Sequence, residues 1–546
     1  MKNGRKYLLA LLFCSTLSLA GCGFQDVVGT PDANPPKDPE VEPIPDPEPE
    51  PEVEMNVDVY DHAYDDLEVS SFNGRKASVT YMDYSKYSYY GTSSCPSIGT
   101  PKILIVPVWF SDSYNYITNK DNVRNDIESA YLGTSEETGW HSVSSFYNTE
   151  SFGQLTLTGT VSPWYECGKA STYYYDDSEG YTSKTVNLVK SAVTWYKANH
   201  ETDLSSFDSN EDGFIDGVIL IYGAPDYIAM GNYSASNLWA YTYWTAASKS
   251  NNGPVANAFF WSSYDFLYSS GSTALSRTGL TSYGSGDTTN CIIDSHTFIH
   301  EMGHVLGLPD YYDYGGSGSP ALGSTMQDLN IGGHDPYSRF ALGWASAYHP
   351  KETQKIELKP FEESGQLIAL STSSSTFGTP FYNYILIELY TPTGVNEFDS
   401  EYRYTNRRRC LTNYGIRIWH VDSRLYSVSK NKVTGLPSTG QVVEGTSNSS
   451  GDRANNLAGS SSYKQLTMLR RNYKFTDVNG KVYTDDRNTT YMTNEDLFVT
   501  GDYFTMNTYK QQFPRRGKLN TGNKLGWSVY FDSVTESGAT ITLIKD

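Results

Sequence analysis

The segment 300–310, which reads HEMGHVLGLPD, constrains the fold of this chain more than any other stretch. His300 and His304 are four residues apart, so on a helix they project from the same face about one turn apart. Gly307 can take the left-handed conformation that ends a helix, and Pro309 stiffens the segment that follows. We therefore predict a helix that ends near residue 306 and a reversal of the chain after it. This helix should bury the apolar residues Phe298, Ile299, Met302, Val305 and Leu306, whose spacing follows the helical period.

Two imidazoles on one face of a helix form a ligand pair that suits Zn²⁺. Asp310 follows His304 by six residues and can swing back as a third ligand, and Asp313 in the same reversal is its rival. Three protein ligands leave a fourth position for water, and Glu301 stands beside it as a general base. The pattern predicts a hydrolytic zinc site, and the alternative is a surface helix that carries two solvated histidines.

The longer pattern His300-Glu301-x-x-His304-x-x-Gly307-x-x-Asp310 resembles the zinc signature of the metzincin-like proteases. Together with Tyr312 and Asp313 it resembles the immune inhibitor A (M6) family of secreted metallopeptidases. The resemblance covers roughly residues 100–350. It implies an endopeptidase and favours Asp310 over Asp313 as the third ligand.

The same resemblance implies a methionine turn beneath the metal, for which Met326 in the segment 323–328 is the candidate. A hydrogen-bond donor for the oxyanion of the transition state should also lie nearby. Tyr337 and His334 are both candidates for that donor, and the sequence does not choose between them.

A second metal site is predicted in the segment 208–216, which reads DSNEDGFID. Acidic and amide side chains alternate as in a calcium loop, and Gly213 allows the sharp turn. Position 12 of the loop is Ile219 instead of the usual Glu, so we expect a structural Ca²⁺ site rather than a sensor. The alternative is an Asx-rich turn without metal. The expected ligands are Asp208, Asn210, Asp212, the Phe214 carbonyl and Asp216.

The first residues of the chain have the pattern of a targeting segment. A basic start and an apolar core precede Leu19-Ala20-Gly21-Cys22, which resembles a bacterial lipobox. We expect residues 1–21 to be a lipoprotein signal peptide and Cys22 to carry the lipid. Residues 22–56 form a Pro/Glu-rich linker, in which ten acidic residues and one lysine lie between positions 26 and 54. The predicted location is therefore the bacterial cell surface, after export, with a lipid anchor in the membrane.

The rest of the chain is predicted to be α+β. Residues 57–98 read as a lead-in or propeptide-like segment, and residues 99–349 as the zinc protease domain. Residues 350–546 contain short strands separated by Gly, Ser and Asn, which favours an antiparallel β-sandwich. In the protease domain we expect strands at 103–110, 155–161 and 217–223 and a helix at 185–199. The polar stretch 427–462 reads as a long loop or a partly disordered insertion.

The net charge of −21 argues against nucleic acid as a partner. We expect extracellular proteins or glycoproteins as substrates and a monomeric protein. Cys95, Cys167, Cys291 and Cys410 could form disulfides or remain thiols. Two alternatives to the protease stay open. One is a catalytically silent surface adhesin or binding module that retains zinc, and the other is a metal hydrolase that acts on something other than protein.

Overall fold

The structure is a computed structural model that describes residues 58–72, 95–177, 183–268, 291–314, 319–372, 379–403, 408–427, 432–433, 442–449, 463–472 and 491–546. The predicted signal peptide, Cys22 and the acidic linker lie outside these residues. In the part of the chain that is described, none of the helices combines the length and the apolar character needed to cross a membrane. The four cysteines after Cys22 are described, and all four are free thiols.

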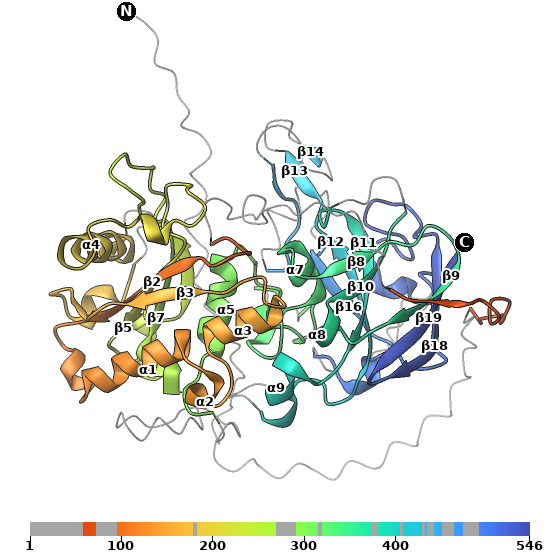
Figure 1. The fold of residues 1–546 in the computed structure, drawn as a ribbon, viewed down its shortest axis with the longest axis horizontal. Helices are drawn as coiled ribbons and strands as arrows, with labels where there is room; N and C mark the ends of the chain where they lie inside the picture. Colours follow the sequence, from red (N-terminus) through yellow and green to blue (C-terminus); the bar gives the residue numbers. More distant parts are fainter. Residues whose placement is uncertain are drawn as a thin grey trace, which may run out of the picture.

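The first half of the chain forms one sheet with the strand order β3-β2-β5-β7-β6, seen on the left of Figure 1. β2, β3, β5 and β7 run parallel, and β6 lies antiparallel to β7 at the edge. The central strands β2 and β5 are apolar from Ile103 to Trp109 and from Val218 to Tyr222, as expected for strands covered on both faces. The strands are β2 Lys102–Trp109, β3 Thr158–Val161, the short β4 Tyr165–Glu166 beside β2, β5 Val218–Tyr222, β6 Tyr241–Trp244 and β7 Ala258–Ser263.

Helices cover both faces of this sheet. Alternate residues of β2 face opposite cores, with Ile103 and Ile105 in one and Leu104 and Val106 in the other. Helix α4 covers the second face, and the helix that carries the histidine motif, α5, packs in the first core. The predicted strands at 103–110 and 217–223 and the helix at 185–199 are confirmed, while the strand expected at 155–161 begins only at residue 158. The longer helices are α1 Lys120–Leu132, α3 Val143–Glu150, α4 Lys184–Asn199 and α5 His296–Val305.

Most described strands of the second half of the chain belong to two five-stranded sheets, in the orders β1-β9-β19-β18-β17 and β16-β12-β11-β10-β8. Residues from both sheets share one hydrophobic core, which includes Ile356, Ile387, Ile418 and Phe531. The α+β class is confirmed by these sheets and helices. The strands are β9 Gln354–Leu358, β10 Gln366–Leu370, β11 Asn383–Tyr390, β12 Gly415–Asp422, β16 Leu466–Leu469, β17 Tyr503–Phe504, β18 Trp527–Thr535 and β19 Gly538–Lys545.

Two parallel strand pairs depart from the antiparallel β-sandwich that we expected for residues 350–546. β1 (Val69–Ser70), from the lead-in segment, joins β9 in parallel, and β8 (Ser346–Tyr348) joins β10 in parallel. The second half therefore recruits strands from before residue 350, because backbone pairing follows proximity in space rather than order in the chain. Figure 1 shows β1 beside the sheet that contains the C-terminus.

The stretch expected to be a loop, 427–462, contains two short strands in its described part. β13 Leu425–Ser427 pairs with β14 Lys432–Val433 and β15 Val442–Glu444 in a small sheet of its own. The loop prediction was therefore wrong for these residues. The shorter α-helices are α2 Ser135–Thr138, α6 Met326–Leu329, α7 Pro336–Ala341, α8 Phe361–Ser364 and α9 Glu397–Glu401.

Candidate metal centre

Helix α5 brings the two motif histidines to one place. It ends at Val305, and Gly307 follows in the left-handed conformation with φ of 101°. The predicted helix end and chain reversal are therefore confirmed. The His300 Nε2 and His304 Nε2 atoms lie 3.1 Å apart. The apolar residues named above are all buried, so the remaining face of α5 is the one that offers ligands.

Asp310 completes a group of three donors with the two histidines. Its Oδ1 lies 3.1 Å from His300 Nε2 and 3.3 Å from His304 Nε2. A tetrahedral zinc ion with bonds of about 2.0 Å separates its ligands by about 3.3 Å. The observed spacings therefore fit that ion. Among the described residues, this is the only set of three His, Cys, Asp or Glu donors whose ligand atoms all lie within 4.8 Å of one another.

Hydrogen bonds at the opposite ring nitrogens orient the two imidazoles. His300 Nδ1 lies 2.9 Å from the Met326 carbonyl, and His304 Nδ1 lies 2.7 Å from the Leu308 carbonyl. A carbonyl can only accept, so each Nδ1 carries the proton and each Nε2 keeps its lone pair for a metal. The predicted methionine turn thus contacts a ligand through its backbone, while the Met326 side chain is fully buried.

Asp313, the rival third ligand, does not join this group. Its Oδ2 pairs with Lys464 Nζ at 2.9 Å instead. Burial would raise the pKa of Asp310, but the neighbouring His304 and His300 hold that pKa below its ordinary value. The structure therefore places Asp310, and not Asp313, as an ionised carboxylate against the histidines.

Glu301, the predicted general base, is almost fully buried beside the ligand group. Thr242 on β6 donates a hydrogen bond to Glu301 Oε2 at 2.9 Å. Burial raises the pKa of the Glu301 carboxyl, against the lowering effect of His304 and His300. A carboxylate whose pKa is raised toward neutrality is suited to take up and release a proton.

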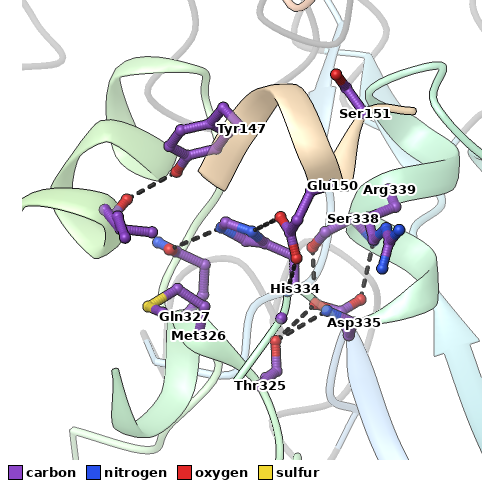
Figure 2. A network of polar contacts seen from close by, with 12 residues as sticks. Tyr147, Glu150, Ser151, Thr325, Met326, Gln327, His334, Asp335, Ser338 and Arg339 are labelled. Carbon is purple, nitrogen blue, oxygen red and sulfur yellow. Dashed lines mark hydrogen bonds and ion pairs between the residues drawn. The ribbon is translucent and has the colours of Figure 1, made fainter. Parts of the chain in front are cut away.

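Both predicted oxyanion donors contact other side chains in the structure. The Tyr337 hydroxyl is fully buried and donates to Glu444 Oε1 at 3.2 Å. The His334 ring is held between Glu150 and Gln327, with Nε2 3.2 Å from Gln327 Oε1 (Figure 2). An oxyanion role for either residue therefore stays a prediction.

Two functional contacts were not foreseen. Tyr314, with an exposed fraction of 43%, donates its hydroxyl proton to Asp310 Oδ2. Thr242 contacts Glu301 across 59 residues of sequence. For the Tyr314 contact, the only signal in the sequence was its position four residues after Asp310. A chain reversal without regular structure gives no rule that predicts which of its side chains contact each other.

The predicted calcium loop forms a tight turn. Asp208 accepts backbone hydrogen bonds from Asp212 at 2.9 Å and from Gly213 at 2.9 Å. Gly213 has a φ of 87°, as the predicted sharp turn requires. Asp216 accepts from the Ser209 amide at 3.2 Å. The turn is as predicted, and its metal stays a prediction.

Known proteins resemble the region that carries the motif. Residues 102–328 match the family described as Immune inhibitor A peptidase M6, catalytic domain. Immune inhibitor A of Bacillus thuringiensis subsp. alesti is 28% identical over 202 residues, which cover 32% of this chain and 26% of that protein. Pre-pro-metalloprotease PrtV of Vibrio cholerae serotype O1 (strain M66-2) is 23% identical over 365 residues, which cover 58% of this chain and 37% of that protein.

The sheet, helix α5 and the three converging donors place residues 102–328 in the metallopeptidase class. Within that class, this segment matches the catalytic domain of the M6 family, which the motif also resembles. The chain spans about a quarter of the length of the first of these relatives and about two fifths of the length of the second.

Proposed function

We propose that this protein is a zinc-dependent endopeptidase that hydrolyses peptide bonds of extracellular proteins. The observation that carries the proposal is the convergence of His300 Nε2, His304 Nε2 and Asp310 Oδ1 beside the buried carboxyl of Glu301. When bound there, zinc would polarise a carbonyl and lower the pKa of a water molecule toward neutrality.

Glu301 would act as the general base. Its buried carboxyl belongs to the residue that follows the ligand His300, and Thr242 donates a hydrogen bond to one of its oxygens. It would accept a proton from the attacking water and deliver it to the leaving amine. The raised pKa favours both transfers, because the group can hold the proton between the two steps.

The test compares the wild-type protein with Glu301→Ala at equal zinc occupancy, using an unfolded protein as substrate. Removal of the base should lower the rate by at least about 100-fold. A variant that cleaves as fast as wild type would contradict the assignment of Glu301. If both proteins bind zinc and neither cleaves, a silent adhesin or binding module replaces the protease as the proposal.

We also propose a structural Ca²⁺ site in the loop 208–216. Burial raises the pKa of Asp216 to about 6, and Asp208 adds to this shift. A divalent cation would offset the burial and the repulsion of these carboxylates. Calcium should therefore raise the melting temperature at pH 7 more than at pH 5, where Asp216 is protonated. Equal melting curves with calcium and with a chelator at pH 7 would reject the site.

Export and a lipid anchor at Cys22 complete the proposal. A lipoprotein of this kind would meet protein or glycoprotein substrates outside the cell, as a monomer. Radiolabelled palmitate should enter the wild-type protein expressed in bacteria and not Cys22→Ala, and light scattering of the detergent-solubilised protein should give the mass of one chain. Label that persists in Cys22→Ala would rule out this attachment point.

A further inference from the structure

The third ligand belongs to a short segment, residues 310–314, that hydrogen-bonds to a distant part of the chain. Asn448 Nδ2 donates to the Tyr311 carbonyl at 2.9 Å, and the Tyr314 amide donates to the Ser449 carbonyl at 3.3 Å. Lys464 Nζ pairs with Asp313 Oδ2 at 2.9 Å, across 151 residues of sequence. We call Asn448, Ser449 and Lys464 the clasp. All three lie beyond residue 328, where the match to the M6 catalytic domain ends.

The clasp is itself anchored in the second half of the molecule. The Asn448 side chain donates to the Leu466 carbonyl at 2.7 Å and accepts from the Leu466 amide at 3.0 Å. Leu466 begins β16, which pairs with β12 in one of the two large sheets. Lys464 Nζ also lies 3.2 Å from the Asn448 carbonyl. The clasp residues are therefore fixed to one another and to a sheet.

The segment 310–314 also contains a direct contact to the proposed third ligand, Asp310. The Tyr314 hydroxyl donates to Asp310 Oδ2, so the other carboxylate oxygen, Oδ1, is left facing His300 and His304. A displacement of residues 311–314 would turn the Asp310 carboxylate and change which oxygen faces the histidines. Outer contacts of this kind orient metal ligands and set metal affinity.

The charge on Lys464 has a second consequence. Asp313 follows Asp310 by three residues and carries a carboxylate that could itself bind a metal. The pair with Lys464 is largely buried, with exposed side-chain fractions of 19% for Lys464 and 12% for Asp313. Lys464 therefore holds this carboxylate away from the three donors.

We propose that the clasp sets the third metal ligand, so that the second half of the chain completes the metal centre. Lys464, Asn448 and Asp313 act as positioning residues, and Asp313 serves as the attachment point of the clasp instead of as a ligand. This inference rests on the proposed zinc peptidase. It adds that the segment matched by the M6 family does not by itself fix the Asp310 carboxylate.

The experiment uses the complete protein with Lys464→Met, Asp313→Asn and the charge exchange Asp313→Lys with Lys464→Asp. Arg471→Met is the matched control, because Arg471 pairs with Asp502 at 2.6 Å among the C-terminal strands. Zinc affinity is measured by competition with a chelator, and the visible spectrum of the Co²⁺-loaded protein reports the ligand geometry. Circular dichroism shows that each variant is folded.

Lys464→Met should lower zinc affinity by about tenfold or more and change the cobalt spectrum. It should lower kcat as well, because the carboxylate is misplaced in every state of the reaction. The charge exchange should recover most of the affinity, and Arg471→Met should behave like wild type. If Lys464→Met and the exchange variant are folded and both keep the wild-type affinity and spectrum, the proposal is overturned.

If Lys464→Met does not fold, the charge-exchange variant still tests the proposal. An exchange variant that folds and keeps the wild-type cobalt spectrum supports the clasp, and one that folds with an altered spectrum and weakened zinc binding contradicts it. Failure of the proposed function would look different. The wild-type protein would then bind zinc and cleave nothing, while the affinities and spectra of the variants would still report on the clasp.

Discussion

Helix α5 carries histidines at both ends, and the two ends have opposite chemistry. At its start, the fully buried His296 places Nδ1 3.0 Å from Asp294 Oδ1 and Nε2 3.1 Å from Asp399 Oδ1. Burial would lower the pKa of His296, but these two carboxylates raise it to about 10. His296 is therefore an imidazolium at neutral pH and has no lone pair for a metal.

At the other end, His300 and His304 each turn Nδ1 toward a backbone carbonyl. The Nε2 atoms of both rings face each other and Asp310 Oδ1, so this side of each ring points into the ligand group. The comparison teaches that the partners of both ring nitrogens matter more than the position on the helix: His296 lies between two structural carboxylates, whereas His300 and His304 each pair one nitrogen with a carbonyl and turn the other toward the ligand group. We call the start of α5 with His296, Asp294 and Asp399 the charged end, and the part with His300 and His304 the ligand end. Asp399 also accepts a hydrogen bond from the Gly332 amide at 2.7 Å, so the charged end connects α5 with the loop that follows α6.

The largest expected effect concerns the ligand end. Dialysis against a chelator should abolish cleavage, and zinc should restore it. Zinc at about 1,000 times its dissociation constant should stabilise the folded state by about 4 kcal/mol. His296→Gln should show the same chelator response if the charged end takes no part in metal binding. Melting curves and cleavage rates of both proteins, with zinc and with the chelator, measure these effects. If His296→Gln no longer responds to zinc, the two ends of the helix do not act independently.

The next effect concerns the stability of the charged end. His296→Gln leaves the buried carboxylates of Asp294 and Asp399 without their shared cation, which should cost about 3–5 kcal/mol of unfolding free energy. The Trp140 ring, stacked on His296 at a centroid distance of 4.0 Å, provides a fluorescence signal for the unfolding curve. A loss below about 1 kcal/mol would mean that the carboxylates find other donors.

The charged end should also make stability depend on pH. The folded-state pKa of His296 lies at about 10, above the ordinary value of 6.5, so its contribution is complete below pH 6.5. It is lost as the pH rises through 10, by as much as a few kcal/mol. Urea unfolding of wild type between pH 6 and 10 should show this loss, and His296→Gln should show a flatter profile. Parallel profiles for the two proteins would assign the alkaline loss to other groups.

Much of the ligand end could be predicted because it is local. The His300 and His304 spacing, the breaker Gly307 and the apolar positions of α5 all lie within about one short segment, where the helical period fixes geometry. The strands β2 and β5 were predictable for a similar reason, since buried parallel strands are apolar throughout.

The parts that could not be predicted depend on contacts between distant residues. Asp399 meets His296 across 103 residues, and Lys464 meets Asp313 across 151. Nothing in the local sequence marks such a pair, because either side chain could equally face solvent. The partners of Tyr337 and His334 could not be predicted for the same reason: both residues follow the motif closely, but their polar atoms contact the distant Glu444 and Glu150.

A smaller effect tests how the ligand end positions its base. Thr242→Val keeps the shape of the side chain and removes the hydroxyl that donates to Glu301 Oε2. Loss of one hydrogen bond to a charged group should lower kcat by about tenfold. Thr242→Ser should retain most of the rate, while KM and zinc affinity stay the same in both variants. Equal rates for Val and Ser at this position would show that the hydroxyl does not orient the base.

The smallest effect probes the middle of α5, between its two ends. A Cβ atom at Gly303 would lie 2.5 Å from Gln327 Oε1, and the Gln327 amide also lies 3.2 Å from His304 Nδ1 and 3.2 Å from His334 Nε2. Gly303→Ala gains about 1 kcal/mol of helix propensity and loses about 1–3 kcal/mol to the overlap, for a net loss of about 1 kcal/mol. Because the displaced amide contacts a ligand histidine, zinc affinity should fall as well, while the alkaline profile set by His296 stays unchanged. A variant that is more stable than wild type and binds zinc equally well would show that Gln327 moves freely, and that the two ends of the helix are coupled less tightly than these contacts indicate.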